Sequence, residues 1–488
     1  MSLDRSAAIA LLALGGCAVG PHYQPAAPVG ADASLGGAET SPAARAFFDS
    51  VAAASPGDSV AAAGAPAGES DLAAAADLAW LDLLRDSTLL DLVRTGLRQN
   101  RDLQAAAARI REFRAQVGVA RAPLFPSLTA NAAAGTNQIP IGGGTPIRFD
   151  ALQVTGNVSW ELDFWGRTRR GVEAARAELG AEEAARQAVV LSLVSDIASG
   201  YLQLLELDQE RVVAESTLAG RRAMLSLAQS RFRQGLTSEL DVRQFEAQVS
   251  APAAALADIE RRRAEQEHRL SVLVGDMPRR IGRGSPLGMA VAALRVPDSL
   301  PASLLARRPD LREAERALAA ATARIGVARA ARLPTVAITG AYGSQSPVFD
   351  DLFSSSSEVY QLQGGVTIPL FTGGRLANES RAALARAEQA KAAYEQTALT
   401  AMREAADALA GVRTAGDQVT AQSAQAVALR RALRLAQLRY RSGVSNYLEV
   451  LEAQRGLFDA EIALSQAQLR QLTSAVLLYR ALGGSWVD

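Results

Sequence analysis

The chain contains one sequence pattern twice, and the two copies are separated by a constant shift of 208 positions. The pentapeptide GVARA occurs at 118–122 and again at 326–330, and Pro126 has its counterpart in Pro334. Other pairs of landmarks that keep this shift are Gly156 and Gly364, Leu162 and Leu370, Arg167 and Arg375, Gly235 and Gly443, and Val242 and Val450. Because an insertion in either copy would break the register, the pattern indicates duplication of a whole structural unit. Any fold of this chain must therefore contain that unit twice.

Each copy contains two stretches in which apolar and polar residues alternate, as in a β-strand with two unlike faces. In the second stretch of the first copy, Val158 and Leu162 share the apolar face and Asn157 lies on the polar face. The loops between the stretches, at 136–149 and 344–357, are rich in Gly, Ser and Pro, which is typical of exposed hairpin connections. The four predicted strands cover residues 124–135, 152–164, 336–342 and 360–370.

A helical period follows each pair of strands. Residues 167–234 contain no proline, and apolar residues recur three or four positions apart, as at Val190, Val194 and Ile197. The expected helix breakers are Gly235 and Gly443, and the expected caps of the following helices are Thr237 and Ser445. Shorter helices are predicted at 100–121, 238–274, 309–329 and 446–482. Since two shorter helices together match one long helix, we expect them to stack end to end beside it, in a rod with a β-hairpin at one end and a helix turn at the other.

The composition excludes several classes of function. With 51 basic and 51 acidic residues the net charge is zero, so no nucleic-acid partner is indicated. Two histidines and one cysteine are too few for a metal cluster, a disulfide framework or a Cys/His nucleophile. The carboxylates Glu161 and Asp163 fall on the polar face of a predicted strand, and the glycines at 142–144 lack the following Lys-Ser/Thr of a phosphate loop. We therefore expect no catalytic residue, no metal and no cofactor.

The amino terminus indicates the cellular compartment. Arg5 precedes a short apolar run that ends in Gly16 and Cys17, and a small residue before a lone cysteine is typical of a bacterial lipoprotein signal. We predict a signal peptide at 1–16 and lipidation of Cys17; the alternative is an ordinary signal peptide with an incidental cysteine. The next residues are rich in Ala, Gly, Ser and Pro, so a flexible lipid-anchored segment is expected at 17–79.

Five motifs extend this interpretation to a known family. They are CAVGPHYQP at 17–25, SWELDFWGR at 159–167, RRPDL at 307–311, IPLFTGGR at 368–375 and RYRSGVS at 439–445. With them the chain resembles the TolC-like outer-membrane efflux channels, in particular the lipoprotein branch that serves RND-type tripartite efflux systems and is also called NodT-like. It departs from the family in a long Ala-rich insertion after Pro25 and in the single Trp80 where relatives often have two tryptophans.

The resemblance implies an α+β membrane protein that acts as a passive conduit in the outer membrane of a Gram-negative bacterium. Four amphipathic strands cannot close a barrel, and no strand edge stays unpaired in lipid. Two chains would supply 8 strands with little lumen, whereas three supply 12 with room for water. The resemblance implies a homotrimer, with a 12-stranded barrel continued by a long periplasmic α-helical barrel. Its implied partners are outer-membrane lipid, a periplasmic adaptor protein and an inner-membrane pump, and its implied cargo is small molecules such as drugs.

The resemblance also implies functional residues. The second helix turn would form a periplasmic gate, comprising Tyr440, Gly443, Val444, Ser445 and Asn446. The first turn would be the tip that contacts the adaptor, comprising Gly235, Leu236, Thr237 and Ser238. Trp160, Phe164 and Trp165 end a predicted strand, where aromatic residues gather at the membrane interface. Relatives often have an acidic residue at the position of Ser445, which is neutral in this chain. Two alternatives follow: a gate held by an ionic ring, or one closed by packing and neutral hydrogen bonds, which would be less sensitive to salt and pH.

The predicted organisation therefore has two structural repeats, at 80–275 and 305–483, joined by a linker at 276–304 and followed by a tail at 484–488. The alternative function is that of a soluble periplasmic coiled-coil adaptor, which would share the helical hairpins. The four amphipathic strands argue against it, since such an adaptor has no use for a lipid-facing surface.

Overall fold

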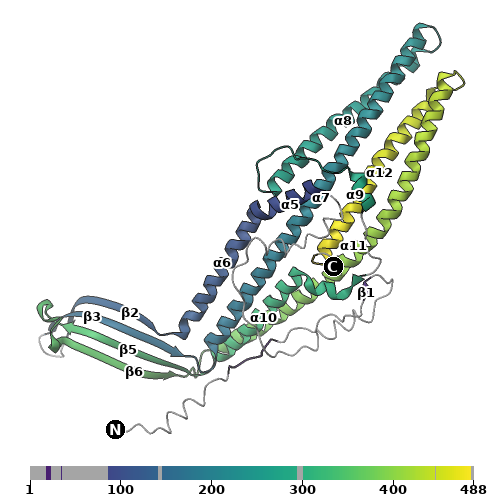
Figure 1. Ribbon diagram of the computed structural model, residues 1–488. Helices are drawn as coiled ribbons and strands as arrows, with labels where there is room; N and C mark the ends of the chain where they lie inside the picture. Colours follow the sequence, from purple (N-terminus) through teal and green to yellow (C-terminus); the bar gives the residue numbers. More distant parts are fainter. Residues whose placement is uncertain are drawn as a thin grey trace.

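The computed structural model describes residues 18–23, 34–35, 86–140, 146–293, 300–445 and 447–484. The molecule is elongated, with a four-stranded sheet at one end and helices that run away from it as a rod (Figure 1). The far end of the rod consists of two helix turns, one from each repeat (Figure 1).

The sheet is antiparallel, with the strand order β2-β3-β5-β6. Its strands are β2 (Ser127–Ile139), β3 (Ile147–Leu162), β5 (Thr335–Ser346) and β6 (Glu358–Thr367). All four predicted strands are confirmed, but their ends differ from the prediction. The β2–β3 hairpin continues into the predicted loop, and β6 stops at Thr367 because Pro369 has no N–H to donate to a strand partner. Ile368 and Leu370, which were expected in this strand, lie beyond it.

The register of the sheet aligns like faces across all four strands. The apolar row through Val158 joins Leu128, Val158, Gly340 and Leu362, and the adjacent row joins Thr129, Asn157, Ala341 and Gln361. The alternation predicted from the sequence therefore extends over the whole sheet, with one apolar and one largely polar face. Among the residues that the structure describes, β2 and β6 each pair with a strand on one side only, so both outer edges of the sheet are open there.

The helices repeat with the shift of the sequence. The long helices α7 (Arg167–Arg233) and α11 (Arg375–Arg441) both have 67 residues, and the return helices α8 (Glu239–Leu273) and α12 (Tyr447–Ala481) both have 35. The helices that open the repeats are α6 (Arg101–Arg121) and α10 (Pro309–Ala330). As expected, α6 and α8 lie along α7, and α10 and α12 along α11 (Figure 1).

Shorter elements complete the chain. They are β1 (Ser34–Leu35), which pairs with β4 (Leu300–Pro301), the helices α5 (Ser87–Gln99) and α9 (Leu287–Ala293), and the 3-10 turns η1 (Ala122–Leu124), η2 (Ala302–Arg307), η3 (Phe349–Asp351) and η4 (Ser355–Ser357). The region expected to be a linker at 276–304 thus contains a helix and a strand.

Glycine ends both long helices as predicted. Gly235 has φ +70° and its N–H donates to the Phe232 carbonyl (2.9 Å), while the Leu236 N–H donates to the Arg231 carbonyl (2.9 Å). Gly443 ends α11 with the same pair of bonds. The expected caps Thr237 and Ser445 were wrong, however. Ser238, not Thr237, caps α8, and the Ser445 hydroxyl makes no hydrogen bond although α12 begins two residues later, at Tyr447.

Equivalent residues also fasten the ends of the return helices. Asn100 Nδ2 donates to the Leu273 carbonyl (2.9 Å), and Arg308 Nη1 donates to the Ala481 carbonyl (2.7 Å). Asn100 and Arg308 are one repeat shift apart, as are Leu273 and Ala481. Arg308 is buried and also binds Asp310 (2.7 Å) and Glu404 (2.8 Å), so the RRPDL motif joins the start of α10 to α11 and α12.

The main core lies midway along the rod, where α5, α7, α8 and α12 meet around residues such as Leu89, Ile197, Leu204 and Val476. One stretch of α7 is long and apolar enough to span a membrane, but most of it is buried in this core. Packing between helices therefore accounts for its composition.

Candidate functional site

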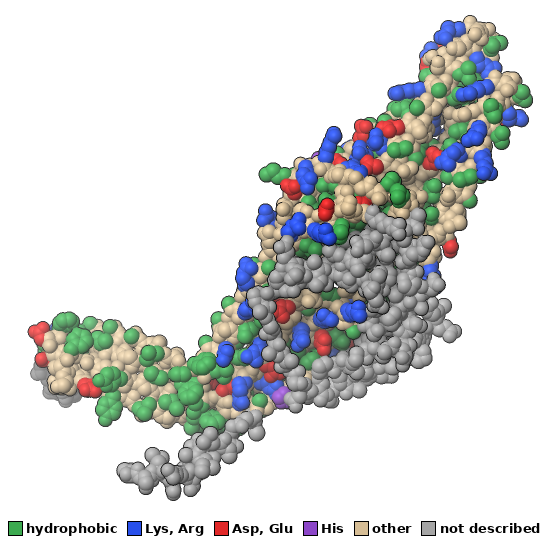
Figure 2. Space-filling view, in the orientation of Figure 1, with side chains coloured by type: hydrophobic (Ala, Val, Ile, Leu, Met, Phe, Trp, Pro, Cys, Tyr) green, Lys and Arg blue, Asp and Glu red, His purple; other side chains and the backbone are tan. Residues whose placement is uncertain are grey.

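The sheet presents a broad apolar surface to its surroundings. Its exposed apolar side chains include Leu128, Val154, Val158, Tyr342, Tyr360, Leu362 and Val366. Figure 2 shows hydrophobic side chains over the sheet end, whereas Lys, Arg, Asp and Glu side chains cover the helical rod. Leu362 is 79% exposed although it lies in the middle of a strand pair. A sheet with so much exposed apolar area on one face is suited to contact with lipid.

Aromatic residues gather where the sheet meets the helices. Trp160 Nε1 donates to the Leu124 carbonyl (3.1 Å), and Trp165 Nε1 donates to the Pro334 carbonyl (2.7 Å). Both rings and that of Phe164 are half-buried. Indole groups with one satisfied polar end and one exposed apolar end are common at membrane surfaces. The position agrees with an interfacial girdle, which remains a prediction.

The first described segment, residues 18–23, is fastened along the helices next to this junction; we call it the N-terminal strap. The Val19 N–H donates to the Trp165 carbonyl (3.1 Å), and Tyr23 donates its hydroxyl proton to Glu315 of α10 (3.0 Å). Gly20 packs so closely on Gly326 that a β-carbon on Gly20 would overlap the backbone of Gly326. This differs from the expectation of a flexible segment from residue 17 onward. Cys17 itself lies outside the described residues.

Arg170 of α7 binds the strap through its guanidinium group. It is 1% exposed, and its guanidinium binds Glu173 (2.7 Å), the Gly20 carbonyl (3.2 Å) and His22 Nε2 (2.9 Å). Because arginine can only donate, His22 Nε2 is the acceptor in this bond. Sequence reasoning missed this role, since an arginine near the start of a helix is usually solvated. The short segment AVGPHY after Cys17 offered no signal of a partner.

At the opposite end of the rod, the expected adaptor tip is an exposed turn. Leu236 is 63% exposed, Gly235 and Ser238 are exposed, and Thr237 is half-buried with its hydroxyl bound to Asp241 (2.6 Å). An exposed apolar side chain at such a turn offers a contact for another protein.

The expected gate residues lie in different environments. Val444 and Gly443 are exposed, Ser445 is half-buried, and Asn446 lies outside the described residues. Tyr440 is buried between the two hairpins, where burial raises the pKa of its hydroxyl. Arg231 of α7 donates to the Tyr440 carbonyl (3.0 Å) and lies over its ring at 4.9 Å. Tyr440 therefore joins the two hairpins of one chain instead of standing free at the turn.

An aromatic cluster strengthens this joint. The ring of Phe245 lies 4.3 Å from that of Tyr447 and 6.2 Å from that of Tyr440, between Val242 and Val450. These residues come from α8, α11 and α12, so the two hairpins are packed together just before their turns.

Two buried carboxylates, Glu206 and Glu210, lie midway along α7. Arg262 of α8 donates to Glu210 (2.9 Å), and Gln466 of α12 donates to its other oxygen (3.3 Å). Burial, with the adjacent Glu210, raises the pKa of Glu206 to about 8. Among the described residues no group of three or more His, Cys, Asp and Glu is arranged to hold a metal ion. With its raised pKa, Glu206 keeps its proton near neutral pH inside the packed helices.

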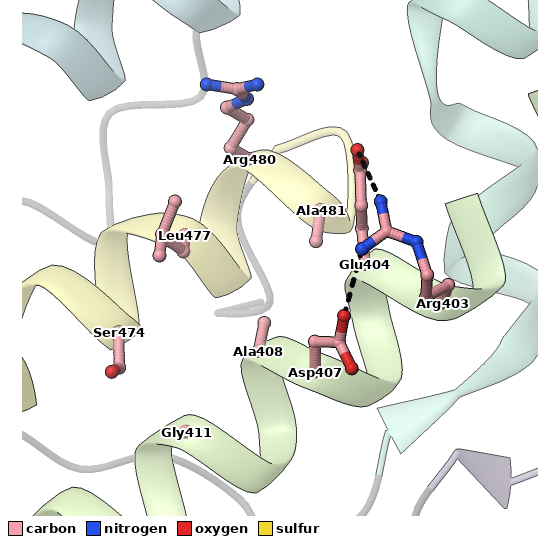
Figure 3. Close-up of a pocket in the computed structure, with 9 residues that line it drawn as sticks. All are labelled: Arg403, Glu404, Asp407, Ala408, Gly411, Ser474, Leu477, Arg480 and Ala481. Carbon is pink, nitrogen blue, oxygen red and sulfur yellow. Dashed lines mark hydrogen bonds and ion pairs between the residues drawn. The ribbon is translucent and has the colours of Figure 1, made fainter. Parts of the chain in front are cut away.

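A groove between α11 and α12 has a volume of about 350 Å³ (Figure 3). Its charged members are Arg403, Glu404, Asp407 and Arg480, and Arg403 binds Asp407 at 3.1 Å. Arg403 and Asp407 are both largely exposed, so their ion pair contributes little and activates no nucleophile. The groove offers shape and charge but no catalytic constellation.

The comparisons with known proteins agree with this geometry. The family model described as outer membrane efflux protein matches residues 92–276 and 300–484, one match for each repeat. The solvent efflux pump outer membrane protein SrpC of Pseudomonas putida is 37% identical over 487 residues, which cover 98% of this chain and 97% of that protein. The antibiotic efflux pump outer membrane protein ArpC of Pseudomonas putida is 34% identical over 491 residues, covering 99% and 96%. The solved outer-membrane channel OprN has a TM-score of 0.77 at 30% identity and covers 88% of this chain and 99% of that one.

Proposed function

Because the chain belongs to the outer membrane efflux protein family, and is thus the outer-membrane channel of an efflux pump and not an enzyme, we propose that it works as a lipid-anchored, passive trimeric conduit. The observation that carries the trimer is a four-stranded sheet with one apolar face and two open edges. Three copies supply 12 strands, which close every edge in lipid and leave an aqueous lumen.

The N-terminal strap supports the lipid anchor at Cys17. Ala18 packs against Gly166, at the junction where β3 leads into α7. A lipid on the residue before Ala18 would enter the membrane beside the aromatic residues that close the sheet. The helical rod then extends into the periplasm, where an adaptor and an inner-membrane pump supply cargo and energy.

The helix turns at the far end form the gate and the adaptor contact in this proposal. Leu236 of the first turn is available for an adaptor, and Val444 and Ser445 of the second turn close the lumen by packing. The second turn contains no acidic side chain from Gly443 to Ser445, so closure needs no ring of bound cations.

The relatives named for solvent and antibiotic efflux favour small apolar or amphipathic cargo. Among the described residues, no metal-binding group favours an ion as cargo. Expression of the chain in a strain that lacks its own outer-membrane channel, together with a matching pump and adaptor, should restore resistance to such compounds.

Purified protein in planar bilayers should also form pores that conduct without any nucleotide or metal. A protein recovered wholly in the soluble periplasmic fraction, with no conductance, would favour the adaptor alternative and overturn the proposal.

A further inference from the structure

We propose that the channel admits small amphipathic anions in preference to cations, and that a stripe of side chains on α11 near the second turn selects them. The entrance stripe, as we call it, comprises Arg431, Arg434, Leu438 and Arg441. This inference rests on the proposed function, in which the second turn of each chain lies innermost at the periplasmic end of a trimer. It adds the class of cargo that charge and shape favour at that entrance.

The entrance stripe occupies one face of α11. Its members follow one another at intervals of three, four and three residues, the spacing that places side chains above one another on an α-helix. All four side chains are exposed, and Leu438 is 55% exposed. Ala436 and Tyr440 lie on another face of α11, where they are buried against the rest of the chain. Packing within one chain therefore does not use the stripe.

The three arginines of the stripe carry charge that no carboxylate of the chain balances. Two other arginines of α11, Arg430 and Arg439, form ion pairs with glutamates of α12 (2.5 and 3.2 Å). Among the residues that the structure describes, no arginine of the entrance stripe forms an ion pair. Because arginine stays protonated at any physiological pH, each chain adds three positive charges to the surface around the second turn.

The first helical hairpin, α7 with α8, lacks this stripe. The positions one repeat shift earlier are Ala223, Ser226, Ser230 and Arg233 of α7. The first hairpin thus has one arginine where the second has three, and a serine in place of the leucine. The two long helices agree in length and in the glycine that ends them, so the difference belongs to the surface and not to the fold.

The turn end of the rod is basic as a whole. The equivalent segments 221–249 and 429–457 contain 11 basic and 5 acidic residues, although the complete chain is neutral. Figure 2 shows Lys and Arg side chains in excess of Asp and Glu side chains at this end. A narrow entrance lined by one sign of charge concentrates ions of the opposite sign and repels ions of the same sign. Since screening acts over about 8 Å at physiological salt, charges on three turns that meet at one axis act together.

The chemistry of the stripe favours an anion with an apolar body over a simple salt ion. A guanidinium group donates two parallel hydrogen bonds to a carboxylate, a geometry that an ammonium group does not offer. Leu438 lies between Arg434 and Arg441 along the stripe, and its exposed side chain can contact the apolar part of a molecule whose carboxylate an arginine holds. A small carboxylate with an apolar ring or chain fits both kinds of side chain.

The ion selectivity of single channels tests this preference. Purified protein in a planar bilayer under a KCl gradient should show a reversal potential of the sign that chloride sets, with chloride about threefold more permeant than potassium. Benzoate, which joins a carboxylate to an apolar ring, should be more permeant than benzylammonium, which has the same ring and the opposite charge.

Paired variants locate the selectivity within the turn end. Arg431→Gln with Arg434→Gln should bring the permeabilities of chloride and potassium close to equality. Arg222→Gln with Arg233→Gln removes the same charge from the first hairpin and should leave most of the preference. Leu438→Ser, which introduces the residue of the first hairpin, should lower the permeability of benzoate and leave that of acetate unchanged. Native gels establish that each variant is still a trimer.

The outcomes separate the selectivity from the conduit. Wild-type pores that prefer potassium, or that pass both ions equally, would overturn the anion preference and leave the proposed function intact. Equal losses from the two double variants would assign the selectivity to the turn end as a whole and overturn the role of the entrance stripe. A protein that forms no pore in any salt would contradict the proposed function, and the anion preference with it.

Discussion

At the scale of single residues, Glu206 makes the stability of the helical rod depend on pH. Its pKa is raised from 4.5 to about 8 by burial and by Glu210, so the folded chain keeps a proton that the unfolded chain loses. The free energy of unfolding should then fall as pH rises from about 4.5 to 8, by about 1–3 kcal/mol.

Glu206→Gln should remove this loss and raise the melting temperature at pH 8.5, with little effect at pH 4.5. Glu239→Gln, at an exposed side chain, is the matched control. Melting curves followed by circular dichroism across this pH range check the prediction, and a wild-type chain that gains stability between pH 5 and 8 would contradict it.

Cys17 carries the second prediction at this scale. Cys17→Ser should abolish incorporation of labelled fatty acid and weaken retention in the outer membrane, while a closed barrel still inserts. Lipid labelling followed by membrane fractionation measures both effects. Undiminished labelling of the variant would show that the lipid lies elsewhere.

Buried polar residues mark the limit of prediction from the sequence. Leu, Val and Ile positions in α7 could be assigned to a core from their spacing alone. Arg170 and Glu206 could not, because a charged residue in a helix is usually solvated and only the tertiary neighbours reveal that it is buried. Arg308 falls between these cases, since its motif was recognised from the sequence but its bond to the Ala481 carbonyl was not.

At the scale of elements, the sheet faces differ in their tolerance of charge. Val158→Arg or Leu362→Arg on the apolar face should cost about 2–4 kcal/mol near the bilayer centre and lower the trimer yield. Asn157→Arg or Gln361→Arg, the adjacent residues on the other face, should mainly change conductance.

Trimer yield on native gels and single-channel recordings distinguish the two sets of variants. Equal yields from both would show that the faces are assigned the wrong way. Ile368, although apolar and in phase with β6, is unsuited to this test because it lies past the end of that strand.

The two helix turns make a contrasting pair. Ser445→Cys should form disulfides between chains in the resting channel and block export, because the second turn closes the lumen in our proposal. Thr237→Cys, one repeat shift away, should not. Non-reducing gels together with a drug-efflux assay check both variants, and disulfides through Thr237 alone would transfer the gate to the first turn.

The type of each helix and strand was predictable because it follows from the local period of its apolar residues. The ends were harder to predict, because each depends on one or two hydrogen-bonding groups. β6 ends before Pro369 for want of a backbone N–H, which could have been foreseen. The choice of Ser238 over Thr237 as cap depends on a reciprocal bond with Asp241, and both residues are good caps by type. Only the geometry of the turn separates them.

At the scale of the whole molecule, the duplication made the overall architecture predictable. A repeat with the order helix, strand, strand, long helix, return helix has few ways to pack against its own copy, so the rod and the sheet follow from the sequence. The N-terminal strap did not follow, because it occurs once and has no counterpart in the second repeat for comparison.

The strap imposes an order of events on biogenesis. Tyr23 and Glu315 are 292 positions apart, so the amino terminus is synthesised long before α10, the helix that receives it. The first repeat supplies Trp165 and Arg170 to the strap, but an incomplete chain lacks the contacts of Gly20 with Gly326 and of Tyr23 with Glu315, so docking is complete only when the second repeat is present and folded. Chains truncated before Pro309 should therefore be cut by protease between residues 18 and 23, while the full-length chain is protected there; equal cleavage of both would contradict this order.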